Sequence, residues 1–346
     1  MEIFRSILAD PKSVYDISYV PDIVYAHRET GDLTLQLLCP AAPNIPRKQT
    51  HKLYAQIEKQ RRADPQYVPP APDTRVFPLI VGVPGSGWSG GDGHNYIAHM
   101  LDLCRQGFVV GCISYRGTFK DDVRYPAAVQ DTREAIRFLR ANADKYHIDV
   151  NNVVLVGDSS GGHTVAAAAL VNDDEQRFNI GEHLEQSAAV KACVIYYGPI
   201  DMTNLVADRL AEGKKLRPGE GDYPFEAREM FQDDFLADPE NILASASPIN
   251  YIATCKKLPR FLYLQGEEDH IIPMAQGLRF CEQVRAHGGR AEFVKIVGAG
   301  HGSGCWTREA VELIAQFLKF SVTPAYSPLC KTRKEAAFRL LPGRCL

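Results

Sequence analysis

The chain has 346 residues, of which 45% are hydrophobic and 23% are charged, and its formal net charge is -3. This length accommodates one large α/β domain or two ordinary ones, and either can bury a substantial core. The near balance of charge argues against nucleic acid or a polyanion as a partner.

The sequence contains no apolar stretch long enough to span a bilayer, and its N-terminal apolar run is too short for the core of a signal peptide. Its 9 cysteines are scattered without a Cys-x-x-Cys pair, which argues against a zinc or redox site of that type. Several of them, such as Cys112, lie in apolar runs that are typical of strands. We therefore expect buried free thiols in a reducing compartment, the cytoplasm.

Short β-rich runs alternate with segments of helical periodicity along the chain. Residues 23–27 and 33–38 flank a Gly-containing turn, which predicts an antiparallel hairpin. Strands then follow at 77–83, 108–114, 153–156, 190–196, 261–264 and 291–296, and helices at 96–105, 126–146, 162–171, 274–285 and 308–320. The alternation predicts an α/β fold with a mostly parallel, doubly wound sheet, helices on both faces and the hairpin added to the same sheet.

Two stretches interrupt this alternation. Residues 41–75 are Pro-rich at both ends and have a basic, helix-like middle at 48–62, while residues 201–250 are polar, acidic and irregular. We expect both to be insertions that shape a pocket on a single domain covering residues 1–346. Residues 321–346 form a basic, Pro-containing tail to which the sequence assigns no role.

The run Gly157-Asp158-Ser159-Ser160-Gly161 fits the pattern G-x-S-x-G and lies between a predicted strand and a predicted helix. That context places a serine on a sharp, strained turn, where the flanking glycines avoid steric clashes. The register of the motif selects Ser159 as the nucleophile over Ser160, whose N–H is left available to an oxyanion. A phosphate-binding loop requires a lysine here, and the run has none.

A serine nucleophile needs a base within hydrogen-bond reach and an acid that orients the base. His301 lies in a glycine-rich loop before the last helix and fits the chain order of serine, acid and histidine. Asp269, after the penultimate strand, is the first candidate for the acid, and Asp201 is the second. We expect its neighbours Glu267 and Glu268 to form a solvated turn. His270 is expected either to line the pocket or to lie outside it.

The loop after the strand at 77–83 reads Pro84-Gly85-Ser86-Gly87-Trp88. Glycine allows backbone N–H groups to approach an oxyanion without interference from a side chain. We assign the oxyanion hole to the N–H of Gly85 or Ser86 together with that of Ser160. Trp88 is either an ordinary core residue or a wall of the substrate pocket.

These motifs resemble the α/β-hydrolase superfamily, and most of all its esterases of the hormone-sensitive-lipase and feruloyl/acetyl-esterase branches. Residues 157–163 are close to the family's GDSAGG block, 265–273 resemble its HGxxDxxVP, and 298–302 match its GAGHG. Tyr115-Arg116 with residues 125–128 resembles YR…FPAA, and Ser247-Pro248 resembles the SP before the acid-bearing strand. The resemblance extends over about residues 20–320.

The resemblance implies an α/β-hydrolase fold with a catalytic triad of Ser159, Asp269 and His301. It implies hydrolysis of carboxylic esters through an acyl-enzyme, with short acyl, aryl, feruloyl or acetyl esters as small-molecule substrates. It implies no metal or organic cofactor. The chain departs from the family where HGGGW becomes residues 84–88, and where Gln265 and Ile272 replace the histidine and the valine of the acid motif. We expect neither Gln265 nor Ile272 to contact the acid.

Two other functions are compatible with these residues. A serine peptidase or amidase of the prolyl-oligopeptidase type uses the same three residue types, but such enzymes usually carry a large extra domain. A non-catalytic hydrolase fold that serves as a binding protein is the second alternative, and the presence of all three triad residue types argues against it. The sequence identifies neither the ester nor the oligomeric state.

Overall fold

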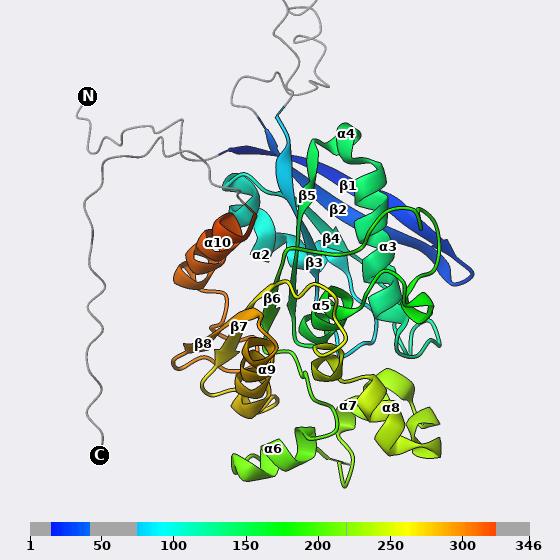
Figure 1. Cartoon of the computed structure of the whole chain (residues 1–346), viewed down its shortest axis with the longest axis vertical. Helices are drawn as coiled ribbons and strands as arrows, with labels where there is room; N and C mark the ends of the chain where they lie inside the picture. Colours follow the sequence, from blue (N-terminus) through cyan, green and yellow to red (C-terminus); the bar gives the residue numbers. More distant parts are fainter. Residues whose placement is uncertain (1–14, 42–74, 219, 323–346) are drawn as a thin grey trace, which may run out of the picture.

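A computed structural model describes residues 15–41, 75–218 and 220–322 of the chain. Its sheet has eight strands in the order β1-β2-β4-β3-β5-β6-β7-β8 (Figure 1). The strands are β1 (Asp16–Arg28), β2 (Gly31–Ala41), β3 (Phe77–Val83), β4 (Val109–Ile113), β5 (Ile148–Asp158), β6 (Ala192–Tyr196), β7 (Arg260–Gly266) and β8 (Arg290–Ile296).

The helices follow the strands in alternation over most of the chain. The α-helices are α2 (Gly93–Arg105), α3 (Ala127–Ala141), α4 (Ala143–Tyr146), α5 (Ser160–Leu170), α6 (Leu205–Ala211), α7 (Phe225–Phe231), α8 (Pro239–Ser245), α9 (Met274–Ala286) and α10 (Arg308–Val322). Short 3-10 helices are η1 (Gln176–Phe178), η2 (Asp234–Ala237) and η3 (Pro248–Tyr251).

The N-terminal hairpin and the parallel strands belong to one sheet, as the sequence predicts. β1 pairs with β2 in antiparallel fashion, and β2 pairs in the same way with β4. The remaining neighbours, from β4 through β3, β5, β6 and β7 to β8, are all parallel. The carboxyl ends of the parallel strands therefore meet at one edge of the sheet, where ligands of open α/β sheets bind.

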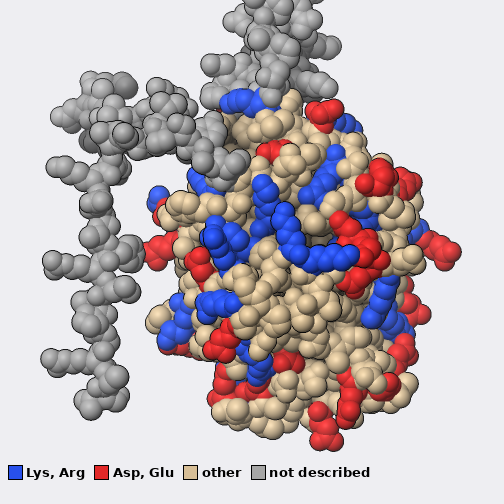
Figure 2. All heavy atoms as spheres, viewed as in Figure 1, with Lys and Arg blue, Asp and Glu red and all other residues tan. Residues whose placement is uncertain are grey.

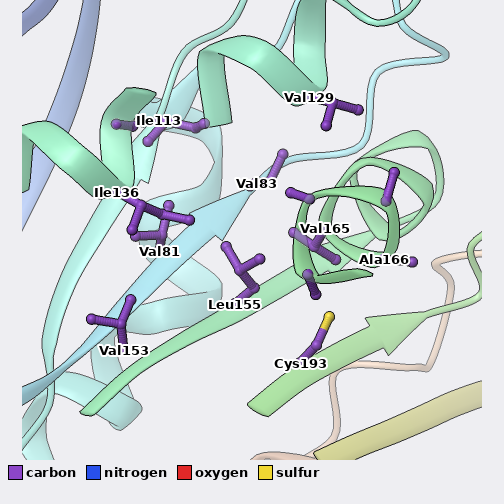
Figure 3. Packing of buried hydrophobic residues seen from close by; sticks show 14 of the residues in the cluster. Val81, Val83, Ile113, Val129, Ile136, Val153, Leu155, Val165, Ala166 and Cys193 are labelled. Atoms are coloured by element: carbon purple, nitrogen blue, oxygen red, sulfur yellow. The ribbon is translucent and has the colours of Figure 1, made fainter. Parts of the chain in front are cut away.

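Apolar residues cover both faces of the sheet, because successive side chains of a strand point to opposite sides. Leu79 and Val81 of β3 join a cluster with α3, α5 and α9, whereas Ile80 joins a second cluster with α2 and α10. Figure 3 shows the first cluster, in which Val81 lies near Ile136 of α3. Helices thus cover both faces of the sheet, which leaves the carboxyl ends of the strands as the place where a functional site can form.

Two expectations about helices are corrected by the structure. The helix expected at 126–146 is divided at Asn142 into α3 and α4. Residues 201–250, expected to be irregular, contain α6, α7 and α8, each seven residues long. Their apolar residues pack with Trp88 in a third cluster, and helices this short show too few turns for a clear period in the sequence.

The surface seen in Figure 2 carries basic and acidic side chains interspersed over the same face. Within the described ranges, no helix combines the length and the apolar character needed to cross a membrane. The cysteines of these ranges are free thiols: Cys39, Cys104, Cys112, Cys193, Cys255, Cys281 and Cys305. The expected basic helix at 48–62 and most of the tail, 323–346, lie outside the described residues.

The start of α5 approaches the sheet so closely that only glycine fits. A Cβ atom added to Gly161 would lie 2.2 Å from the carbonyl oxygen of Val83 at the end of β3. A Cβ atom added to Gly157 would lie 2.5 Å from the carbonyl oxygen of Gly161. In both cases the atom that the added Cβ would meet is a backbone carbonyl oxygen, so no flexible side chain can move away to relieve the clash.

Substitution Gly161→Ala should therefore destabilise the protein by about 1–3 kcal/mol, because the added methyl group forces α5 away from β3. Urea unfolding followed by circular dichroism measures this change. Gly221→Ala is the control, since its Cβ would meet no atom within 4 Å. Equal stability of the two variants would contradict the packing argument.

Candidate active site

Ser159 forms the turn between β5 and α5 at the carboxyl edge of the sheet. Its backbone has φ 52° and ψ -123°, a combination that costs strain in a residue with a side chain. The turn is fixed because the Ser159 N–H donates to the carbonyl of Tyr196 at 2.9 Å and the Ser159 carbonyl accepts from His163 N–H at 3.0 Å. This is the sharp turn that the G-x-S-x-G motif predicts, with the serine side chain only partly buried.

The structure brings Ser159, His301 and Asp269 together from three separate loops. The Oγ atom of Ser159 lies 2.9 Å from Nε2 of His301, and Nδ1 of His301 lies 2.9 Å from Oδ2 of Asp269. A carboxylate only accepts hydrogen bonds, so the neutral imidazole carries its proton on Nδ1. Nε2 is then the acceptor for the serine hydroxyl, which is the arrangement that a general base requires.

The carboxylate of Asp269 is 1% exposed and accepts four hydrogen bonds. Oδ1 accepts from the N–H groups of Ile271 at 2.8 Å and Ile272 at 2.9 Å. Oδ2 accepts from Nε2 of Gln265 at 2.7 Å as well as from His301. The expectation that Gln265 and Ile272 do not contact the acid is therefore wrong, because the loop folds back and encloses the carboxylate.

The other acidic and basic candidates of the sequence lie elsewhere. Asp201 is buried and forms an ion pair of 2.8 Å with Arg279 of α9. Glu267 lies in the turn after β7 and pairs with Lys295 at 2.5 Å. Glu268 and His270 are exposed. Among the candidates for the acid, only Asp269 contacts His301 in the described part of the chain.

The loop of residues 84–88 lies against the Ser159 turn, but its N–H groups are directed at side chains. The N–H of Gly85 donates to Oδ1 of Asp158 at 2.8 Å, and that of Ser86 donates to Oγ of Ser160 at 2.8 Å. This differs from the expectation that Gly85 or Ser86 presents an open donor to an oxyanion. The Ser160 N–H is the first of α5 and has no acceptor within the helix, so it remains suited to that role.

Asp158 and Tyr115 hold this loop, and sequence reasoning assigned a role to neither. Burial raises the pKa of Asp158, although the Gly85 N–H and the Tyr197 hydroxyl both donate to its carboxylate. The hydroxyl of Tyr115 donates to the carbonyl of Pro84 at 2.7 Å. Since that hydroxyl has one proton, it accepts at 2.9 Å from the hydroxyl of Ser86. Both residues lie inside motifs of the sequence, but the partners named here are between 29 and 73 residues away in the chain.

Trp88 occupies the third cluster beneath the helices of residues 201–250. Its side chain is buried, and its ring meets that of His163 edge-on at 5.2 Å between centroids. The apolar neighbours come from α6, α7, η2 and α8 and from residues next to α6 and α8: Met202, Leu205, Ala227, Met230, Phe231, Phe235, Leu243 and Ala246. Of the two roles considered for Trp88, this placement corresponds to a core residue.

Glu229 of α7 is a further residue at this loop that the sequence did not single out. A Cβ atom added to Gly87 would lie 2.9 Å from Oε1 of Glu229, so the carboxyl group rests against the loop. Oε2 lies 3.6 Å from Nη1 of Arg217, and the side chain is only 20% exposed. Burial raises the pKa of Glu229 to about 7.

Comparison with known proteins places this geometry in a family context. The sequence pattern of the BD-FAE family matches residues 66–284, which is more than half of the chain. Esterase LipC of Mycobacterium tuberculosis is 31% identical over 252 residues, which cover 71% of this chain and 59% of LipC. Esterase LipQ of the same organism is 27% identical over 254 residues, covering 72% of this chain and 56% of LipQ. The chain thus spans somewhat more than half the length of these relatives.

Solved structures share the fold. Esterase Est2 of the Planctomycetes species Thermogutta terrifontis superposes with a TM-score of 0.63 at 20% identity, covering 92% of this chain and 96% of that one. At this identity the likeness concerns the fold alone, and it confirms the predicted α/β-hydrolase fold. The match over residues 66–284 goes further, and the chain belongs to the BD-FAE family of α/β-hydrolase proteins.

Proposed function

We propose that this protein is a serine carboxylesterase that acts on a small-molecule ester. The observation that carries the proposal is the hydrogen-bonded series from Ser159 Oγ through His301 to Asp269, with both bonds at 2.9 Å. The esterase names of LipC and LipQ support the type of bond. The free cysteines of the described ranges support a reducing compartment, for which we propose the cytoplasm.

In the proposed reaction, Ser159 Oγ attacks the ester carbonyl carbon and its proton passes to Nε2 of His301. The negative charge that develops on the carbonyl oxygen is stabilised by the N–H of Ser160 at the start of α5. When the tetrahedral intermediate collapses, the C–O bond of the alcohol breaks and the alcohol leaves with the proton from His301. Water, deprotonated by the same imidazole, then attacks the acyl-enzyme and releases the acid and free Ser159.

Asp269 contributes by holding the imidazole and by stabilising its charged form. Its carboxylate keeps the proton of His301 on Nδ1, so that Nε2 faces Ser159. The N–H groups of Ile271 and Ile272 and the side chain of Gln265 fix the carboxylate from its other sides. No step of this reaction calls for a metal or an organic cofactor.

We also propose that residues 201–250 shape the substrate pocket on a single domain. Glu229 of α7 rests on the loop of residues 84–88, and Lys214 contacts the backbone of Asp269. Residues 201–250 therefore contact the proposed site at two places, through α7 and through the turn after α6. Residues 41–75, for which the sequence suggests a similar role, lie almost entirely outside the described residues.

Substitution Ser159→Ala should lower kcat/KM for a short-chain aryl ester by at least about a thousandfold, because it removes the nucleophile and leaves the fold intact. A fluorophosphonate probe should label the wild-type protein at Ser159 and leave the variant unlabelled. Ser303→Ala, an exposed serine of the His301 loop, is the matched control and should retain activity and labelling.

Three outcomes would overturn the proposal in different ways. Near-native activity of Ser159→Ala would remove Ser159 from the reaction. Absence of labelling and of hydrolysis in the wild-type protein would favour a binding protein. Faster cleavage of aminoacyl anilides than of aryl esters would favour an amidase or peptidase.

Glu229 should make stability depend on pH. Its pKa in the folded protein, about 7, is above the ordinary value of 4.5, so the folded state binds the proton more tightly. The resulting stabilisation is fully present below about pH 4.5 and is lost as the pH rises through 7. Because Glu229→Gln removes this loss, the variant should gain on the order of 2 kcal/mol relative to wild type between pH 5 and pH 8.

Urea unfolding of both proteins at each pH measures the difference. Glu240→Gln, at an exposed position of α8, is the control and should show a constant offset. A constant offset for Glu229→Gln as well would contradict the raised pKa.

A further inference from the structure

The loop that carries Asp269 is held from outside by the end of α6 and the turn after it. Three side chains of this segment, Arg209, Glu212 and Lys214, contact the backbone between Asp269 and Ala275; we call them the brace. Figure 1 shows α6 below α9 in this view, farther from the strands of the sheet. The brace belongs to the 201–250 insertion, so it is separate in sequence from all three members of the proposed triad.

The side chain of each brace residue forms hydrogen bonds with backbone groups of the loop or of the start of α9. Nε of Arg209 donates to the carbonyl of Ile271 at 2.9 Å. The carboxylate of Glu212 accepts from the N–H groups of Met274 at 3.1 Å and Ala275 at 2.8 Å. These N–H groups open α9 and have no acceptor within the helix, and a negative charge is favourable there.

Lys214 makes the most direct of these contacts. Its Nζ atom donates to the main-chain carbonyl of Asp269 itself at 2.6 Å, and it pairs with Glu212 at 3.2 Å. The lysine is only 17% exposed, so this position is well defined. Asp269 thus accepts a hydrogen bond from His301 at its carboxylate and one from Lys214 at its main-chain carbonyl.

The brace is itself anchored in buried charge. Arg209 is fully buried and pairs with Glu226 at 2.6 Å, while Glu220 is its second carboxylate partner. Removing Arg209 would take the guanidinium partner from the buried Glu220 and leave Glu226 with Arg217 alone, which would destabilise the fold. Lys214 lies at the edge of this network: its backbone N–H donates to the carbonyl of Arg209 at 2.9 Å, and its amino group pairs with Glu212. A substitution of the side chain keeps the backbone bond, so the contribution of the amino group to Asp269 can be separated from folding.

We infer that Lys214 is a positioning residue for the proposed reaction, which acts through Asp269 by fixing the backbone of the acid against the brace. The inference rests on the proposed function. A rotation of the Asp269 backbone displaces its carboxylate from Nδ1 of His301, and misplacement of a catalytic group by about 1 Å can cost on the order of a hundredfold in rate. The insertion therefore stabilises the acid side of the triad as well as bordering the pocket.

A double-mutant cycle with Asp269→Asn tests this inference. Lys214→Met keeps the length of the side chain and removes its donors, so kcat for a short aryl ester should fall about tenfold while KM stays within about twofold. In the Asp269→Asn background the same change should alter kcat by less than about twofold. Lys214→Arg should restore most of the activity, and Lys215→Met, the exposed neighbour, should have no effect.

The proton on Nδ1 of His301 gives a second readout that needs no substrate. Its downfield NMR resonance should shift or broaden in Lys214→Met and remain unchanged in Lys215→Met. A tenfold loss in both backgrounds, or no loss in either with an unchanged resonance, would overturn the inference. A wild-type protein that hydrolyses no ester, but whose His301 resonance responds to Lys214→Met, would instead reject the proposed function and retain the contact.

Discussion

The backbone of Ser159 has positive φ, and the rest of the site depends on the contacts that hold it there. A residue with a side chain stays in this region only where its surroundings over-determine it. Here β5 ends and α5 begins within one residue, and Gly161 lies directly against the carbonyl of Val83. The tight packing of α5 on β3 thus fixes the turn that carries the Ser159 side chain.

The same close approach organises the loop of residues 84–88. Asp158 and Ser160 accept hydrogen bonds from the N–H groups of Gly85 and Ser86 and so connect the loop to the Ser159 turn. The hydroxyl of Tyr115 donates to the carbonyl of Pro84 in the same loop. The side chains of Asp158 and Ser160, which precede and follow Ser159, therefore hold the loop of residues 84–88 in place.

The sequence predicted the strands and helices of the sheet well, because long apolar runs and helical periods are local properties. It failed where order depends on distant partners. The helices α6, α7 and α8 are too short for a period, and they form because Trp88 and its neighbours bury their apolar faces. Gln265 was expected to lie apart from the acid, yet it donates to Asp269, since only the folded loop brings the two side chains together.

By itself the sequence determined which residues are candidates for the triad, since motif register, strand position and chain order select Ser159, Asp269 and His301. The tertiary structure decided that these three lie in one hydrogen-bonded series, that Asp201 pairs with Arg279 instead, and that the N–H of Gly85 is directed at Asp158. The physical reason is that a hydrogen bond depends on atoms within about 3 Å. In this site, residues far apart in the chain reach that distance because parallel strands end at a common edge of the sheet.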